Sequence, residues 1–235
     1  PIFIVGLPRS GKTVTETILC KNTRAIPGGE SRQFAHIIET ELKNDQLTTF
    51  QESILNSDKH QLHLIGERYV RSLQKRFKTT HQITNTLPGN ASRLGAISIC
   101  LPKARIIWVD RAQLDTCFDM YRKDFEKGHE YSYDLNTLAR YTSLFNELME
   151  HWTQVLPGNI YKLRFEDLIS EPAKWLGEIA EFCQLDMDTS MANGEENANG
   201  AITGHELIPD TEDICGIWTA YEKQLQPLIQ AIKER

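Results

Sequence analysis

The chain has 235 residues, of which 40% are hydrophobic and 25% are charged, the composition of an ordinary globular protein with one sizeable core. Its formal net charge of −6 argues against a broad nucleic-acid-binding face, which is usually basic, although a few local cations would still bind a small anion. No apolar run reaches the roughly 18 residues of a transmembrane helix, so we expect no membrane span.

The cysteine and histidine patterns argue against a disulfide framework and against a metal site. The five cysteines are odd in number and form no C-x-x-C pair, which indicates free buried thiols in a reducing, cytoplasmic compartment. The seven histidines show no metal-ligand spacing, so we predict no metal. The chain opens directly on a predicted strand, without a visible signal peptide, which suggests that residues 1–235 form a single domain of a longer protein.

The first predicted element is a strand at residues 2–5, which leads into a glycine loop at residues 6–13 and then into a helix. The loop sequence GLPRSGKT fits G-x-x-x-x-G-K-[ST] at every specified position and has the strand-loop-helix context that this motif requires. Its glycines let backbone N–H groups approach an anion, and the helix start adds the positive end of a dipole. We therefore expect this loop to hold the phosphate end of a nucleotide-like ligand.

The rest of the chain alternates predicted helices with predicted strands. A short strand at residues 25–30 ends in a glycine turn with Glu30 at its mouth, and Arg111 follows a strand at residues 105–109. Further strands are predicted at 81–86 and 160–165, and helices at 31–43, 65–77, 91–100, 115–126, 135–155, 174–183 and 214–232. The Asn- and Gly-rich residues 187–213 are predicted to form a mobile surface segment.

This alternation predicts a three-layer α/β fold of the P-loop type, in which a short, mainly parallel sheet has helices on both faces. Ligands of such sheets bind at the carboxyl ends of the strands. The loops that carry residues 9–13, Glu30, Asn85 and Arg111 all follow predicted strand ends. We therefore expect these loops to converge on one cleft.

Two enzyme classes fit the glycine loop taken by itself. In an ATP-dependent kinase or NTPase, Lys12 would bind the β- and γ-phosphates and the Thr13 hydroxyl would bind Mg²⁺. Such an enzyme also needs an acidic residue after an apolar strand, and Asp110 follows the run at residues 106–109. The second class is indicated by segments well beyond the loop.

Segments in order along almost the whole chain resemble the sulfotransferase family. Residues 1–11, PIFIVGLPRSG, resemble the opening of the family, and residues 28–30 resemble the G-G-E segment of protein-tyrosine sulfotransferases. Residues 84–90 resemble T-D-K-x-P-x-N, 105–121 resemble K-I-I-x-x-x-R-D-P-x-D-x-C-x-S-x-Y, 164–168 resemble R-Y-E-D-L, and 216–228 resemble G-x-W…Y-E-K…P-L. The chain is most similar to the bacterial sulfotransferase domain that is often joined to tetratricopeptide repeats, so we expect such a repeat region in the full-length protein.

The resemblance implies transfer of a sulfuryl group from PAPS (3′-phosphoadenosine 5′-phosphosulfate) to a hydroxyl of a small molecule or peptide, without a metal. Glu30 would act as the general base, with Arg9 and Lys12 as catalytic cations at the transferred group. Arg111 would pair with the 3′-phosphate. The implied donor-binding residues are Arg9, Ser10, Gly11, Lys12, Thr13, Arg111, Asp119 and Trp218. We expect residues 44–60, 122–134 and 187–213 to shape the acceptor site.

Several positions depart from the family pattern and indicate a divergent member. Lys12 stands where the family usually has Thr, and Asp119 stands where it usually has the Ser that follows the 3′-phosphate arginine. Thr86 replaces a lysine, and Ile217 replaces a basic residue. Because a carboxylate beside a phosphate is repulsive, a different donor, low activity, or nucleotide binding without turnover remain alternatives.

Several of these side chains also have a purely structural interpretation. Glu30 could satisfy N–H groups at the start of the following helix. Arg111 could pair with Asp115 on a helix surface, and Trp218 could belong to the core. Such an interpretation fits Lys12 least, because Lys12 lies within the glycine loop itself.

Overall fold

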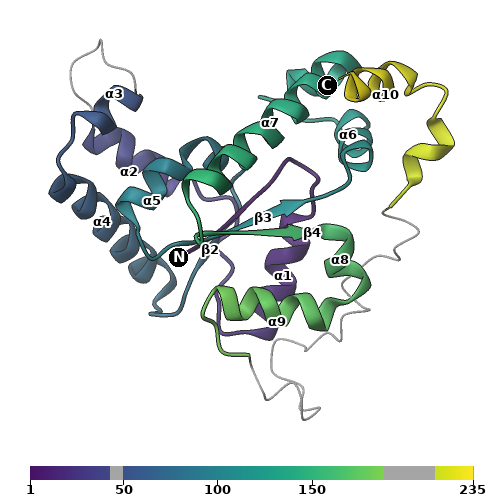
Figure 1. Cartoon of the computed structure of the whole chain (residues 1–235). Coiled ribbons are helices and arrows are strands. Elements are labelled where there is room, and N and C mark those ends of the chain that lie inside the picture. Colours follow the sequence, from purple (N-terminus) through teal and green to yellow (C-terminus); the bar gives the residue numbers. More distant parts are fainter. Residues whose placement is uncertain (43–49, 188–214, 235) are drawn as a thin grey trace.

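The computed structural model describes residues 1–42, 50–187 and 215–234, and within them four parallel strands form the central sheet. The strands are β1 (Ile2–Val5), β2 (Thr84–Asn85), β3 (Arg105–Asp110) and β4 (Ile160–Arg164), in the order β2-β1-β3-β4 (Figure 1). Because all pairs are parallel, every strand ends at the same edge of the sheet. This confirms the predicted parallel α/β architecture.

Helices cover both faces of the sheet, because β1 and β3 are apolar at successive positions. Phe3 and Val5 pack into one core, and Ile2 and Ile4 pack into another on the opposite face. The first core includes α2 (Gln33–Glu41), α4 (Lys59–Phe77), α5 (Leu94–Cys100) and α7 (Leu135–Val155). The second includes α1 (Lys12–Asn22), α8 (Phe165–Ser170) and α9 (Pro172–Phe182).

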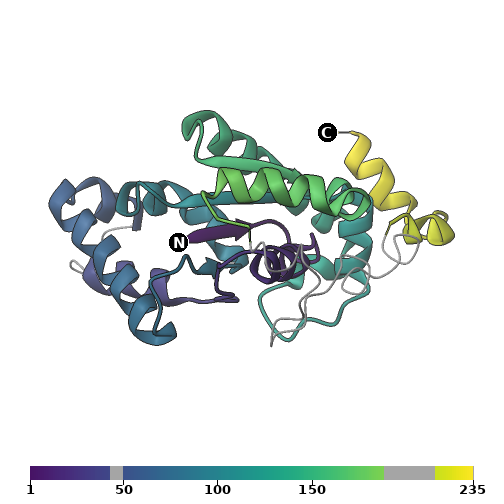
Figure 2. The ribbon, with the colours of Figure 1, turned by 90° about the horizontal axis from the view of Figure 1, so that it is seen from below.

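A third group of elements lies toward the carboxyl ends of the strands (Figure 1). It consists of α6 (Gln113–Tyr121), the short 3₁₀ helices η2 (Glu130–Tyr133) and η5 (Ile217–Tyr221), and α10 (Gln226–Lys233), all packed with α7. Figure 2 shows α10, in yellow, at the opposite end of the molecule from the blue helix α4. The remaining short elements are α3 (Phe50–Leu55) and the 3₁₀ helix η1 (Pro88–Arg93).

The helices agree best with the prediction where the amphipathic pattern is long, and α7 has the predicted bounds. By contrast, α4 begins at Lys59 rather than at residue 65, because the Asp58 carboxylate caps it by accepting the Gln61 N–H (2.7 Å). The predicted helix 115–126 ends early, at Tyr121. In place of the predicted helix 214–232 the structure has η5 and α10, and α8 has no predicted counterpart.

The two strand predictions near β2 are wrong in length. Of residues 81–86 only Thr84–Asn85 form a strand, and residues 25–30 contribute only a bridge between Ile26 and Ile83. Except for Met187, the segment predicted to be mobile, 187–213, lies outside the described residues. No helix in the described part of the chain is long and apolar enough to cross a membrane.

Candidate active site

The phosphate loop, residues 6–11, leaves the buried strand β1 and ends where α1 begins. Two of its residues have left-handed backbones, Arg9 (φ 66°) and Gly11 (φ 96°). A Cβ at Gly11 would lie 2.2 Å from the Phe165 ring, so only glycine fits there. Gly11 precedes α1 without a side-chain cap, which leaves the first N–H groups of the helix to an anion.

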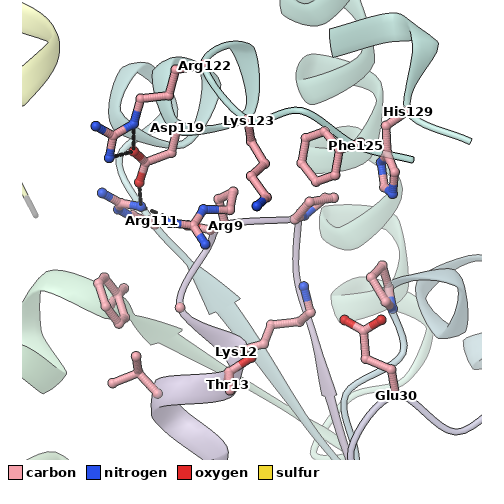
Figure 3. Close-up of a pocket in the computed structure, with 15 residues that line it drawn as sticks. Arg9, Lys12, Thr13, Glu30, Arg111, Asp119, Arg122, Lys123, Phe125 and His129 are labelled. Carbon is pink, nitrogen blue, oxygen red and sulfur yellow. Dashed lines mark hydrogen bonds and ion pairs between the residues drawn. The ribbon is translucent and has the colours of Figure 1, made fainter. Parts of the chain in front are cut away.

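Lys12 lies at the start of α1 and is only 6% exposed. Its ammonium donates a hydrogen bond to the Leu7 carbonyl (2.9 Å) across the phosphate loop. Burial lowers the pKa of Lys12 to about 8, while the negative charge of Glu30 acts to raise it. Figure 3 shows the Lys12 and Glu30 side chains facing each other, so Lys12 brings a positive charge next to the carboxylate at neutral pH.

Arg111 follows β3 and is held from two sides, with its side chain 4% exposed. Its Nη1 donates to the Arg9 carbonyl (2.7 Å) and to Asp119 Oδ2 (2.7 Å). The other oxygen of Asp119, Oδ1, lies 2.7 Å from Arg122 Nη2. Two guanidinium groups therefore share one carboxylate (Figure 3), and the ion pair of Arg111 is with Asp119 rather than with Asp115.

The connection between α6 and η2, residues 122–129, forms another wall of the site, with cations at its start and an aromatic pair at its end. The rings of Phe125 and His129 lie 4.3 Å apart between centroids. His129 Nδ1 lies 2.9 Å from the Tyr131 hydroxyl, and the Tyr131 ring stacks on Tyr141 at 3.6 Å. Packing behind the wall thus fixes the aromatic pair in place.

Glu30 is exposed at the end of a glycine turn and points into the site (Figure 3). The structure does not use its carboxylate to cap α2. Instead, the Gln33 N–H at the start of α2 donates to the Ser31 hydroxyl (3.3 Å). The structural interpretation of Glu30 as a helix cap therefore fails.

These elements surround a pocket of about 520 Å³ at the carboxyl edge of the sheet, a volume typical of small-molecule sites. Its lining carries more cations than carboxylates, which makes it attractive to an anion. The lining residues are Pro8, Arg9, Gly11, Lys12, Thr13, Val14, Glu30, Pro88, Arg111, Asp119, Arg122, Lys123, Phe125, His129 and Phe165.

The pocket brings together most of the site residues expected from the sequence, namely Arg9, Gly11, Lys12, Thr13, Glu30, Arg111 and Asp119. Ser10 and Trp218 are not part of its lining. Ser10 is 2% exposed and lines a small separate cavity beside Trp108 and Asp110. Trp218 packs against the core formed by α6, α7 and α10, as its structural interpretation predicts.

Asn85 and Asp110, which the sequence placed at strand ends near the cleft, are also absent from the pocket lining. Asn85 is buried, and its Nδ2 donates to the Ser31 carbonyl (3.0 Å). Asp110 Oδ2 lies 3.5 Å from Lys162 Nζ. Across residues 1–42, 50–187 and 215–234, no group of three or more His, Cys, Asp or Glu side chains is placed to hold a metal.

From the sequence, residues 122–134 were expected to shape the acceptor site, but none of their individual side chains was singled out. The structure places Arg122, Lys123, Phe125 and His129 of this segment in the lining, together with Pro88. One signal was present in the sequence, because Asp119 and Arg122 are three residues apart and such neighbours meet on a helix surface. Nothing in the sequence indicates that His129 and Phe125 face the phosphate loop.

Comparison with known proteins gives a match to the profile described as "Sulfotransferase family" over residues 1–189. A curated protein of Aquifex aeolicus (strain VF5), described as "Uncharacterized protein", is 29% identical over 246 residues. This match covers 100% of the chain and 32% of that protein. The chain thus spans about a third of the length of the curated relative it matches.

Several solved structures with a similar fold are sulfotransferases. The sulfotransferase domain of the Synechococcus PCC 7002 olefin synthase has a TM-score of 0.60 and 16% identity, over 93% of this chain and 86% of that one. The sulfotransferase domain from the curacin biosynthetic pathway has a TM-score of 0.53 and 14% identity, over 88% and 81%. A sulfotransferase from Alicyclobacillus acidocaldarius has a TM-score of 0.52 and 13% identity, over 99% and 94%.

Proposed function

Because the chain belongs to the sulfotransferase family, we propose that it transfers a sulfuryl group from PAPS to a hydroxyl-type acceptor. The observation that carries this proposal is the make-up of the pocket, where a phosphate loop and five cationic side chains converge on Glu30. A donor that carries phosphate and sulfate groups requires such a cationic site. A hydroxyl acceptor requires a base beside the transferred group.

The residues of the pocket fit such a donor at two places. At the helix start, Gly11, Lys12 and Thr13 would hold the 5′-phosphosulfate through N–H groups and the Lys12 ammonium. At the far side, Arg111 would meet the 3′-phosphate, with Arg122 adding a guanidinium that offsets the carboxylate of Asp119. Ser10 and Trp218 have no side-chain role at the donor in this proposal, because neither lines the pocket.

Sulfuryl transfer breaks the S–O bond to the donor phosphate and forms an S–O bond to the acceptor oxygen. Glu30 takes the proton of the acceptor hydroxyl. Arg9 and Lys12 stabilise the negative charge that develops on the phosphate oxygen as it leaves. The protein thus contributes position and charge, as in phosphoryl transfer.

Single features favour two other functions. Lys12 and Thr13 fit an ATP-dependent kinase or NTPase, although Asp110, the acid that this function needs, lies outside the pocket and near Lys162. The ion pair of Asp119 with Arg111 favours a module that binds a nucleotide without turnover. Mg²⁺ dependence would separate the kinase from a PAPS enzyme, and nucleotide binding without turnover would single out the binding module.

The test is a calorimetric titration without Mg²⁺ that compares PAP (3′-phosphoadenosine 5′-phosphate), AMP and ATP. We expect PAP to bind more tightly than AMP, and Arg111→Ala to weaken PAP far more than AMP. Equal losses for the two ligands would show that Arg111 does not read the 3′-phosphate. ATP binding that appears only with Mg²⁺, while PAP stays silent, would overturn the proposed function in favour of a kinase.

Glu30→Gln tests the proposed base. We expect turnover to fall by about 10²- to 10⁴-fold, because the amide cannot take the acceptor proton. PAP affinity should be retained, because the substitution removes no donor cation. Glu39→Gln is the matched control, since Glu39 lies on α2 outside the pocket and pairs with Arg93 (3.0 Å). Wild-type turnover in Glu30→Gln would remove Glu30 from this role.

We further propose that residues 1–235 form a single domain of a longer cytoplasmic protein with a tetratricopeptide-repeat region. The length of the Aquifex aeolicus relative supports a longer parent chain, since the match covers 32% of it. Limited proteolysis of the full-length protein should release a stable fragment of about this size. Progressive cleavage within residues 1–235 would contradict a single domain.

A further inference from the structure

The glycine turn that carries Glu30, residues 28–31, is held by the three residues at the end of β2. Thr84 Oγ1 accepts the Gly28 N–H (3.1 Å). The Thr86 N–H donates to the Gly29 carbonyl (3.0 Å), and Asn85 Nδ2 donates to the Ser31 carbonyl (3.0 Å). The segment Thr84–Thr86, in which the family's charged residues are missing, therefore acts on the backbone of the turn.

The two glycines of the turn are required for this arrangement. A Cβ at Gly28 would lie 2.1 Å from the Thr84 carbonyl oxygen, which is backbone and cannot move aside. Gly29 has φ +62°, a conformation that L-residues rarely adopt. The backbone of Glu30 thus has little freedom, although its side chain is exposed to the pocket.

One further hydrogen bond ties this turn to α1, the helix that begins at the end of the phosphate loop. Glu16 lies on α1, one helical turn after Lys12, and is 7% exposed. Its Oε1 accepts the Gly29 N–H (3.1 Å) and the Thr84 hydroxyl. Burying a carboxylate costs free energy unless its oxygens are hydrogen-bonded. The buried Glu16 carboxylate therefore depends on its two hydrogen bonds, which indicates that those bonds have a role besides packing.

We propose that Glu16 is a positioning residue, which fixes the turn of Glu30 to the helix that begins at the phosphate loop. Lys12 and Glu16 belong to the same rigid helix, so the donor side of the pocket and the proposed base are held in one unit. This inference rests on the proposed function, in which Glu30 must meet a hydroxyl beside the transferred group. A displacement of about 1 Å at such a contact costs on the order of a hundredfold in rate.

Glu16→Ala removes the acceptor of both hydrogen bonds, while Glu16→Gln keeps an oxygen at the same reach. We expect Glu16→Ala to lower kcat by about 10- to 100-fold, while the Kd for PAP changes by less than about threefold. Glu16→Gln should restore kcat to within about threefold of the wild type. Glu16→Asp, one methylene shorter with the same charge, should behave like the alanine variant.

Hydrogen exchange supplies a readout that does not depend on activity. In Glu16→Ala, the peptide that contains Gly28 to Ser31 should exchange faster than in the wild type, because the Gly29 N–H loses its partner. Glu16→Gln should keep the wild-type protection. Thr142→Val is the control for lost stability, since Thr142 is fully buried and bonded to Gln113 and Ala139 outside the pocket.

Three results would overturn the proposal: wild-type kcat in Glu16→Ala, unchanged exchange in the turn, or a loss of PAP binding as large as the loss of kcat. An equal loss of kcat in Thr142→Val would also overturn it, because it would reduce the role of Glu16 to general stability. If Glu16→Ala does not fold, Glu16→Asp carries the same comparison. Failure of the proposed function would be distinguishable from failure of this inference. In that case the wild type would sulfate no acceptor, but hydrogen exchange in the turn would still be faster in Glu16→Ala than in the wild type.

Discussion

The ammonium of Lys12 lies where a ligand phosphate is expected, and its pKa is lowered to about 8 by burial. As the pH rises through this value, the free protein loses that positive charge. We expect the Kd for PAP to increase by up to about tenfold per pH unit above about pH 8. Calorimetric titrations with PAP between about pH 6.5 and about pH 9.5 measure the Kd at each pH.

Lys12→Met should bind PAP more weakly and without this pH dependence. An unchanged slope of Kd with pH in the variant would assign the titration to another group.

The lowered pKa of Lys12 also makes the free energy of unfolding depend on pH. Because the unfolded chain holds the proton up to the ordinary value of 10.5 while the folded protein releases it at about 8, the free energy of unfolding should rise with pH between these values.

Asp119 offers a second prediction for a single residue. Asp119→Asn removes the charge that Arg111 and Arg122 share, so we expect the preference for PAP over AMP to increase by about tenfold. The free energy of unfolding of the free protein should fall by about 3 kcal/mol, because Arg111 remains buried without its partner carboxylate. Titrations with both nucleotides and urea unfolding measure the two effects.

Asp124→Asn is the matched control for Asp119→Asn, since Asp124 lies in the connection after α6 but outside the pocket lining. It should change neither the nucleotide preference nor the stability by a comparable amount. An unchanged preference in Asp119→Asn would mean that the carboxylate does not oppose the 3′-phosphate. The departure from the family's serine would then have no effect on the donor.

The sequence placed Arg9, Lys12, Glu30 and Arg111 together in one pocket. Arg9 and Lys12 follow β1 and Arg111 follows β3, whose ends lie at the same edge of the sheet, whereas Glu30 lies on a turn held by the residues at the end of β2. The sequence could not place Arg122, since a charged residue three positions after Asp119 is equally compatible with an exposed helix face. The aromatic pair of Phe125 and His129 depends on the path of a connection without regular structure. Such paths follow from tertiary packing, which local sequence patterns do not encode.

At the scale of elements, the long helices and buried strands were predictable because many residues repeat one pattern. The length of β2 was not, because only Thr84 and Asn85 pair with β1, and the side chains of both residues bond to the glycine turn. The six-residue helix α8 follows β4 directly, and its first residue, Phe165, was predicted as the last residue of that strand. The C-terminal segment begins α10 only near Pro227, which suits the first turn of a helix.

The glycine turn gives a prediction at this scale, because Gly28 meets the Thr84 backbone at its closest approach. Gly28→Ala should lower the free energy of unfolding by several kcal/mol, on the order of other strained core substitutions. Urea denaturation measures the change. Gly177→Ala is the control, because Gly177 lies in α9 with nothing within 4 Å of an added Cβ.

We expect Gly177→Ala to stabilise the protein by about 0.5–1 kcal/mol, as alanine does for glycine inside a helix. Opposite signs for the two substitutions would show that close approach, and not the loss of glycine as such, decides the outcome. A neutral Gly28→Ala would mean that the turn can move away from β2. The turn that carries Glu30 would then not be held in a fixed position relative to β2.

For the whole molecule, the sequence was sufficient to predict a parallel sheet with its ligand site at the carboxyl edge, since alternating strands and helices allow few other arrangements. It was not sufficient to give the strand order β2-β1-β3-β4. That order puts β1 between β2 and β3, so the phosphate loop lies between the turn of Glu30 and Arg111. The convergence of these residues is a property of the sheet as a whole.

The charge of the molecule and the charge of the pocket have opposite signs, with a net charge of −6 and five cationic side chains in the lining. PAP binding should therefore depend on local cations and weaken with salt. Raising the ionic strength from about 0.1 M to about 1 M shortens the Debye length from about 10 to about 3 Å. We expect the Kd for PAP to rise more than that for AMP, and equal slopes would contradict a cationic 3′-phosphate site.

The connection between α6 and η2 supplies Arg122 and Lys123 to the cationic side of the pocket and Phe125 and His129 to its aromatic wall. Under the proposed function, a single short stretch of the gene would therefore encode residues for both donor binding and acceptor choice. A laboratory evolution campaign that diversifies this stretch to obtain new acceptors will also alter the donor side. Improved variants should accordingly accumulate as linked pairs of mutations, in which the second restores what the first has disturbed.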